Sequence, residues 1–284
     1  MPIVSDIKSL RVQGATNVAL ASIKALRLTA KRSSDRSLMQ NLNKTAKLLV
    51  STRPTEPMMR NAIRYIMHFV ERAEDKRKVL NAASKTFTSL AKKSKEQIGH
   101  IGARRLKHFS TVLTHCHSST VMGILKEAKP DVICTESRPR YQGRLSALEL
   151  AENKIKVKLI VDSAVNNYIR DVDCVVVGSD IITSEGNTIN KIGTSQIALC
   201  AEESGIPLYV ASSLLKFDPE TTFGTFDEIE HRSPNEVWRK KHKNIEILNP
   251  AFDVTPHKRI ESYITEFGVY APASLYEIVE EHYP

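Results

Sequence analysis

Two residues of this chain, Cys116 and Asp180, have types and positions that suit proton transfer. Cys116 follows the apolar run Thr111–Thr114 and comes just before a segment that can form a helix. A helix start favours a thiolate through its dipole and its free N–H groups, and a thiolate can act as a base or a nucleophile. Asp180 follows four apolar residues and a glycine, where a carboxyl group can be partly desolvated. Together they predict an acid and base pair able to move a proton beside a carbonyl group.

Both residues also allow a purely structural interpretation. A single cysteine beside a sheet can be a small apolar residue, and an aspartate at a strand end can cap the next turn. That interpretation fits Cys134, Cys174 and Cys200 better, because they lie inside apolar runs or within a helical pattern.

Cationic side chains occur in the same kind of segment, just beyond predicted strands. They are Arg138, Arg140, Lys191 and Lys216. Arginine forks and lysine point charges are the groups that a phosphorylated ligand needs. The helix start after Ser118 adds a further anion site. These segments therefore predict a phosphorylated ligand.

The sequence gives little support for a metal or a redox cofactor. His115, Cys116 and His117 are adjacent, so on an extended segment they point in different directions, and no second ligand pair has zinc spacing. No GxGxxG follows the first predicted strand and no GxxxxGK[ST] occurs, which leaves a dinucleotide fingerprint and a P-loop unsupported. We expect neither a metal nor a cofactor.

The candidate residues must be positioned by the short apolar runs that precede them. These runs predict strands at Thr111–Thr114, Asp131–Thr135, Val157–Val161, Asp173–Val177, Pro207–Ala211 and Ile245–Leu248. Segments that can form helices lie between most of them, at Thr120–Ala128, Leu145–Lys154 and Thr194–Glu203. Alternating strands and helices predict a mainly parallel sheet covered on both faces, with ligands bound beyond the carboxyl ends of its strands.

The first part of the chain has a different pattern, with apolar residues at helical spacing. Three shorter helices and one long helix from Asp75 to Leu106 are expected there. The predicted fold class is therefore α/β, with an N-terminal all-helical domain over residues 1–108 and a Rossmann-like domain over residues 109–284.

Composition limits the classes of protein to consider. With 284 residues, 41% hydrophobic and 26% charged, the chain is long enough for one large domain or two of ordinary size. No apolar run approaches the roughly 20 residues of a membrane span, and the N-terminus shows no secretory signal. We therefore expect a soluble cytoplasmic protein without a membrane partner, whose four scattered cysteines are free thiols.

Charge divides the chain into two unequal parts. Residues 1–110 carry 23 Lys and Arg against 7 Asp and Glu, whereas residues 111–284 carry 18 against 25. Such an imbalance is typical of a nucleic-acid surface, of a phosphate-rich ligand, or of a basic surface that docks on an acidic one in an oligomer. The basic part has three phenylalanines and one tyrosine, too few for base stacking, so nucleic acid is disfavoured.

The strand-end segments resemble a family that joins the regulatory subunits of eukaryotic initiation factor 2B to two sugar-phosphate isomerases. The similar segments are THCHSST (114–120), ESRPRYQGR (136–144), VVVGSDIITSEGNTINKIGT (175–194), LLKFDPET (214–221) and NPAFDVTPHKRIESYITEFGV (249–269). The helical part matches more loosely, through RVQGA (11–15) and STRPTEP (51–57). The tail is most similar to that of the archaeal ribose 1,5-bisphosphate isomerases.

This resemblance implies conversion of α-D-ribose 1,5-bisphosphate into D-ribulose 1,5-bisphosphate, on a route from AMP to the substrate of Rubisco. It implies that Cys116 accepts a proton and Asp180 donates one, and that the protein forms a homo-oligomer, either a dimer or a hexamer built from dimers. The phosphate contacts it implies are the backbone of Gln13, Gly14, Ala15 and Thr16, then Arg53, Ser118, Asn190, Lys191 and Lys216, with Arg138 and Arg140 in a matching loop.

Two departures leave other functions open. The isomerases typically have arginine where this chain has Gln13, and some members have lysine where it has Ser119. One alternative is a non-catalytic subunit, related to initiation factor 2B, that binds a nucleotide or sugar phosphate. The other is the methylthioribose 1-phosphate isomerase branch. Cys116 favours an enzyme, because the regulatory relatives commonly lack this cysteine.

Overall fold

The computed structural model describes residues 2–9, 11–12, 14–53, 56–221, 229–240 and 242–283. The chain divides into two compact units by packing. Unit 1 comprises residues 1–93 with 215–217 and the terminal residue, and unit 2 comprises residues 94–214 and 218–283. The domain boundary expected near residue 108 stays a prediction.

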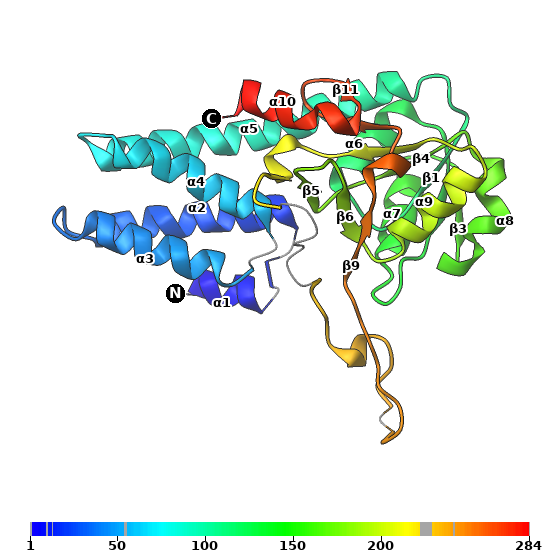
Figure 1. The fold of residues 1–284 in the computed structure, drawn as a ribbon, viewed down its shortest axis with the longest axis horizontal. Coiled ribbons are helices and arrows are strands. Elements are labelled where there is room, and N and C mark those ends of the chain that lie inside the picture. Colours follow the sequence, from blue (N-terminus) through cyan, green and yellow to red (C-terminus); the bar gives the residue numbers. More distant parts are fainter. Residues whose placement is uncertain are drawn as a thin grey trace. The chain divides into compact units, whose positions relative to one another are not determined.

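Unit 1 is helical, as the apolar spacing predicts (Figure 1). Its helices are α1 (Pro2–Lys8), α2 (Ala15–Arg32), α3 (Leu38–Val50), α4 (Pro57–Glu71) and residues 76–93 of α5 (Lys76–Arg105). The helix α2 packs against α3 and α4, and its buried face carries Val18, Ile23 and Leu26. The long helix predicted between Asp75 and Leu106 is confirmed as α5.

Unit 2 is built on a seven-stranded sheet with the order β11-β10-β7-β4-β1-β2-β3. All neighbours are parallel except β10 and β11, which pair antiparallel. The strands are β1 (Thr111–Thr114), β2 (Asp131–Thr135), β3 (Val157–Ile160), β4 (Cys174–Val177), β7 (Leu208–Ala211), β10 (Ser262–Ile264) and β11 (Val269–Tyr270). The mainly parallel sheet expected from the sequence is confirmed.

Both faces of this sheet are buried at its central strands. Val112, Val132 and Val176 belong to one core cluster, together with side chains of α5, α6 (Ser119–Ala128) and α7 (Gln142–Glu152). The intervening residues Leu113 and Ile133, which point to the opposite face, are buried as well. The remaining helices of the unit are α8 (Val165–Tyr168), α9 (Thr194–Glu203) and α10 (Leu275–His282).

Three further strands, β5 (Ile181–Thr183), β6 (Thr188–Lys191) and β9 (Phe252–Thr255), pair antiparallel beside the main sheet. A two-residue strand, β8, covers Phe217–Asp218. The strand predicted at Ile245–Leu248 is wrong: these residues form no regular element, and the side chain of Leu248 is 66% exposed. The sequence pattern missed β5, β6, β9, β10 and β11 (Val269–Tyr270), because these strands are short and their few apolar residues are mixed with polar ones.

No helix within the described residues is both long enough and apolar enough to cross a membrane.

The contact between α7 and β2 depends on a residue without a side chain. A Cβ atom added at Gly143 would lie 1.7 Å from the carbonyl oxygen of Thr135, which is backbone and cannot move aside. The start of α7 can therefore approach the end of β2 only with glycine at this position.

We expect Gly143→Ala to lower the free energy of unfolding by about 3 kcal/mol or more, because the backbone must shift to admit a methyl group. Gly123→Ala is the matched control, since a Cβ at this α6 position meets nothing within 4 Å; it should be neutral or stabilise by up to about 1 kcal/mol. Urea denaturation measures both changes, and equal shifts would contradict the packing described.

Candidate active site

The sheet topology brings two distant segments to one place. The chain runs from β1 outward through β2 and β3, then returns to place β4 on the other side of β1. This reversal of strand order is a topological switch point, where α/β sheets bind ligands. Cys116 follows β1, and Asp180 follows β4. A Cβ at Gly178 would lie 2.7 Å from Oγ of Ser118, so the two strand-end loops are in contact.

Cys116 adopts a backbone conformation that is rare for a residue with a side chain. Its φ angle is 66°, in the left-handed region. Two hydroxyl groups hold it there: the N–H of Cys116 donates to Oγ of Ser137 at 2.7 Å, and the hydroxyl of Ser146 donates to the carbonyl of Cys116 at 2.8 Å. Strained backbone of this kind persists only where its surroundings fix it, and such residues cluster at functional sites.

Ser137 is itself held in place by a carboxylate. The two oxygens of Asp162 accept the N–H groups of Ser137 and Arg138, at 2.7 and 2.6 Å. Asp162 lies just after β3, and Ser137 just after β2. Three neighbouring strand ends thereby contribute to the position of Cys116.

His115 is a buried neutral residue of the same network. Its Nε2 lies 2.9 Å from the carbonyl of Ile192, which can only accept, so Nε2 carries the proton. Its Nδ1 then accepts from the hydroxyl of Thr135 at 2.6 Å. Burial lowers the pKa of His115, which keeps the imidazole uncharged. His115 therefore ties the end of β1 to the loop after β6.

His117 takes different partners from His115. Its Nδ1 lies 3.0 Å from Oγ of Ser146, and its Nε2 lies 3.6 Å from a carboxylate oxygen of Glu149. The same carboxylate pairs with Lys126 at 2.8 Å. Because Ser146 gives its proton to the carbonyl of Cys116, it accepts from His117, and this chain of contacts fixes the serine rotamer.

The sulfur of Cys116 lies among charged groups, but burial has the largest effect on it. Burial raises the pKa of Cys116 to about 11; the positive charge of Lys191 and the N–H of His117 lower it, and Asp180 and Asp162 raise it. Asp180 and Lys191 thus both lie within electrostatic reach of the thiol. The sequence predicts a helix start that favours the thiolate. That expectation is wrong here, because the cost of desolvating the anion exceeds the stabilisation.

The side chain of Asp180 makes no hydrogen bond or ion pair with any residue the structure describes. Its N–H donates to the carbonyl of Ile189 at 2.9 Å, which fixes the backbone beside β6. The carboxyl group is half-buried. An aspartate capping the next turn would use its oxygens on nearby N–H groups, so the capping interpretation does not describe Asp180.

Lys191 and Asn190 lie at the end of β6 in a loop that Asp253 holds. The carboxylate of Asp253 accepts the N–H groups of Gly193 and Ser195, at 2.7 and 3.1 Å, at the start of α9. Burial raises the pKa of Asp253 to about 6. Nδ2 of Asn190 donates to Oγ1 of Thr194 at 3.0 Å. The loop that carries Lys191 is therefore fixed on both sides.

Arg138 and Arg140 interact with residues of the segment 234–237. The guanidinium of Arg138 donates to the hydroxyl of Tyr141 at 2.8 Å and to the carbonyl of Val237 at 3.1 Å. Arg140 is exposed, and its charge contributes to the lowered pKa of Glu236, for which the hydrogen bond from Arg232 is the largest cause. Neither arginine has a contact with Cys116 or Asp180 among the described residues.

The other predicted site residues belong to unit 1. Three segments contact the start of α4 there. Oγ1 of Thr16 lies 3.7 Å from Sδ of Met58, and Arg53 pairs with Glu56 at 2.9 Å. Nδ2 of Asn61 donates to the carbonyls of Leu215 and Phe217, on either side of Lys216. Gly14 and Ala15 begin α2. Gln13 lies outside the described residues.

Sequence reasoning missed the residues that position Cys116: Ser137, Ser146, Thr135 and Asp162. Their signal was weak, because serine, threonine and aspartate beyond strand ends are common in turns and caps. His115 and His117 were considered as metal ligands instead. Within the described residues, no three His, Cys, Asp or Glu side chains gather as a metal site would require.

Comparisons with known proteins find similar sequences and structures over nearly the whole chain. The model of the initiation factor 2 subunit family matches residues 11–272. A ribose 1,5-bisphosphate isomerase from Archaeoglobus fulgidus is 42% identical, over 97% of this chain and 90% of that protein. The crystal structure of translation initiation factor eIF-2B from Pyrococcus horikoshii has a TM-score of 0.84 at 29% identity, covering 95% of this chain and 96% of its own. The 5-methylthioribose 1-phosphate isomerase of the same organism gives 0.79 at 30%, covering 98% and 87%.

A thiol with a pKa of about 11 predicts a particular pH dependence of alkylation. The rate of Cys116 alkylation by iodoacetamide should rise about tenfold per pH unit from pH 7 to about 10, because only the thiolate reacts. Lys191→Met should slow the reaction at pH 9, since it removes a positive charge that lowers this pKa. Mass spectrometry of the Cys116 peptide measures both. A rate that levels off below pH 8 would contradict the predicted pKa.

Proposed function

This chain belongs to the initiation factor 2 subunit family, and on that basis we propose that it is an isomerase converting α-D-ribose 1,5-bisphosphate into D-ribulose 1,5-bisphosphate. Relatives named for this activity match nearly its full length. The observation that carries the proposal is the thiol of Cys116, held in a strained backbone with Asp180 and Lys191 within electrostatic reach.

The chemistry follows from a base and an acid at one site. Asp180 donates its proton to the ring oxygen as the furanose opens, and the thiolate of Cys116 removes the proton from C2. The electrons of the C2–H bond form an enol between C1 and C2. The C2 hydroxyl then returns a proton to Asp180 as the ketone forms, while the thiol of Cys116 protonates C1. One proton thus leaves each group and returns to it, as an isomerisation requires.

The raised pKa of Cys116 is consistent with this role. A base of high pKa is a strong proton acceptor, and carbon acids such as C2–H need one. Lys191 offsets part of the desolvation cost of the thiolate. The cost of ionising the sulfur is a barrier that substrate binding energy must help to overcome.

We further propose that both substrate phosphates are bound by the groups that match the family motif. In unit 2 these are Ser118, Asn190 and Lys191; in unit 1 they are Arg53, Lys216 and the backbone from Gln13 to Thr16. Remote phosphate contacts hold C2 against the base, a positioning effect worth several kcal/mol. Arg138 and Arg140 are weaker candidates for phosphate binding, because they interact with the segment 234–237.

The resemblance also supports two proposals about context. The product would enter the route from AMP to Rubisco, and the protein would form a homo-oligomer, a dimer or a hexamer of dimers. Native mass spectrometry measures the oligomeric state directly.

Purified protein should convert ribose 1,5-bisphosphate into ribulose 1,5-bisphosphate, measured by a coupled assay with Rubisco and labelled carbon dioxide. Cys116→Ser should lower kcat by at least about a hundredfold, because it replaces the base with a far weaker one. Asp180→Asn should lower kcat similarly and change KM much less, because its part is proton donation rather than binding.

The controls separate three functions. A folded wild-type protein that is inert on this sugar but binds it or a nucleotide would support a regulatory subunit, related to initiation factor 2B, instead. Faster turnover of 5-methylthioribose 1-phosphate would assign the other isomerase activity. Full activity in Asp180→Asn would remove Asp180 from the acid role.

Ser146 is a positioning residue, because it reaches the reacting sulfur only through the carbonyl of Cys116. Ser146→Ala should lower kcat about tenfold with little change in KM, since the strained backbone loses one of two hydrogen bonds. Ser146→Thr keeps the hydroxyl group and should restore most of the rate. Equal loss in both variants, or a change in KM alone, would show that the hydroxyl does not act through Cys116.

A further inference from the structure

Unit 1 contains a basic groove that shares no residue with the candidate active site. The groove lies between α2 and the first turns of α5, and it has a volume of about 580 Å³. We call it the α2/α5 groove; its lining includes Lys24, Arg27, Leu28, Lys31, Arg77 and Asn81. Cavities of this volume are typical of small-molecule sites.

Three cationic side chains of the groove lie on one face of α2. Lys24, Arg27 and Lys31 are spaced by three and four residues, so they follow one another along the helix over about 10 Å. All three are exposed. Like charges at these spacings repel and destabilise a helix. Because the three side chains are exposed and their charges repel, neither burial of apolar surface nor helix stability explains why they line one groove.

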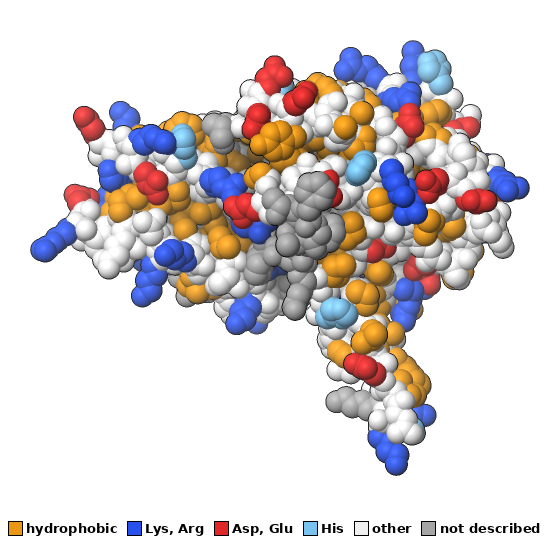
Figure 2. Space-filling view, viewed as in Figure 1, with side chains coloured by type: hydrophobic (Ala, Val, Ile, Leu, Met, Phe, Trp, Pro, Cys, Tyr) orange, Lys and Arg blue, Asp and Glu red, His pale blue; other side chains and the backbone are white. Residues whose placement is uncertain are grey.

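No described carboxylate pairs with these three side chains. Nε of Arg27 donates to the amide oxygen of Asn81 at 3.1 Å, which orients the guanidinium and leaves its charge uncompensated. Residues 1–93 carry nineteen Lys and Arg against six Asp and Glu, so few local acids are available. Figure 2 shows Lys and Arg side chains spread over the helices of this unit.

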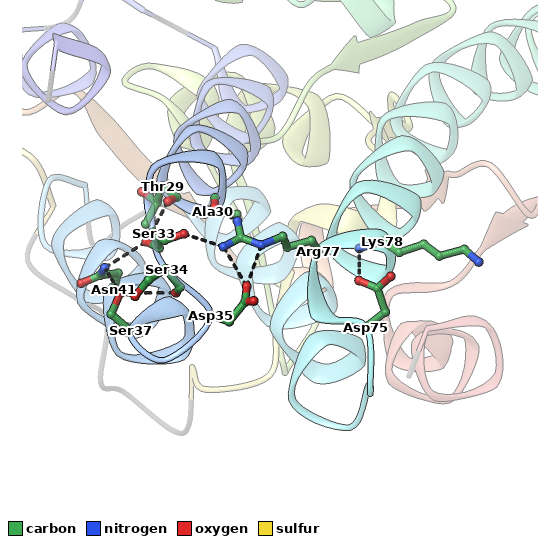
Figure 3. Close-up of polar contacts among 10 residues, drawn as sticks. All are labelled: Thr29, Ala30, Ser33, Ser34, Asp35, Ser37, Asn41, Asp75, Arg77 and Lys78. Carbon is green, nitrogen blue, oxygen red and sulfur yellow. Dashed lines mark hydrogen bonds and ion pairs between the residues drawn. The ribbon is translucent and has the colours of Figure 1, made fainter.

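Arg77 has a different part in the groove. Its guanidinium donates to the carbonyls of Ala30 and Ser33 at the end of α2, and to the carboxylate of Asp35 at 3.2 Å (Figure 3). These contacts fasten the start of α5 to the end of α2. Arg77 thus builds the wall of the groove, and the α2 cations supply its unbalanced charge.

We propose that the α2/α5 groove binds a small anion with several phosphate groups in a chain. Three cations spread along two turns of helix match the length of a phosphate chain better than that of a single phosphate. None of the lining residues is aromatic, so the groove lacks the stacking platforms with which single-stranded nucleic acids are bound. The phosphate chain is common to free polyphosphate and to nucleoside triphosphates. The inference is independent of the proposed isomerase activity.

Titration calorimetry of the full-length protein with tripolyphosphate at low ionic strength tests the proposal. Wild type should bind, and the double variant Arg27→Ala/Lys31→Ala should bind at least about tenfold more weakly, because two charge-assisted contacts are lost. Lys44→Ala/Lys47→Ala is the matched control. It removes two exposed cations of α3 that do not line the groove, and it should stay within about twofold of wild type.

A second arm compares ATP with tripolyphosphate. Tighter binding of ATP that depends on Arg27 and Lys31 supports a nucleotide as the ligand, and equal binding supports the phosphate chain alone. Equal weakening in the two double variants would overturn the proposal, because general surface charge would then explain binding. Absence of tripolyphosphate binding, or groove-dependent binding of a single-stranded RNA alone, would overturn it too. Circular dichroism confirms that each variant is folded.

Discussion

The pairing of β1 with β4 is the constraint on which the candidate active site depends. The strands lie side by side, with Val112 opposite Cys174 and Leu113 opposite Val175, although three α-helices and two strands separate them in sequence. At the edge they share, each strand ends in a polar loop, one with Cys116 and the other with Asp180. Had the chain continued outward from β3, these two side chains would lie at opposite ends of the sheet. Reversal of the strand order at β1 thus creates the site.

Once the two loops meet, their chemistry is set by a balance between burial and charge. The thiol of Cys116 is largely removed from water, which opposes the thiolate, while Lys191 favours it. Asp180 lies close enough to oppose it as well. Hydrogen bonds hold this arrangement: Ser137, Ser146 and Asp162 fix the strained backbone, and His115 joins the β1 loop to the segment after Lys191. Such preorganisation is typical of catalytic sites, where folding has already fixed the orientation of the reacting groups.

The two units of the chain differ in whether their charged side chains have partners. In unit 2, the carboxylates of Asp162 and Asp253 beside the site accept hydrogen bonds from backbone N–H groups. In unit 1, the cations of α2 have no acidic partner among the described residues. The first arrangement fixes the loops of the proposed isomerase site. The second supports the proposed anion site, which the sequence motifs do not identify, because the cations are dispersed along a helix and form no recognisable signature.

The sequence by itself determined the elements and the reactive residue types. Periodicity was sufficient for the four predicted helices of the first part and for β1, β2, β3, β4 and β7, since apolar spacing and burial have the same period. The residues themselves predicted Cys116 and Asp180 as an acid and base pair, and the resemblance added which of them accepts and which donates the proton. Tertiary structure alone decided three things: the return of β4 beside β1, the left-handed backbone of Cys116, and the raised pKa of its thiol. Each depends on groups far apart in the chain, such as Ser146 and Lys191, whose proximity no local pattern encodes. The sequence pattern missed β5, β6, β9, β10 and β11, because each of these short strands carries at most two apolar residues and none forms an extended apolar run.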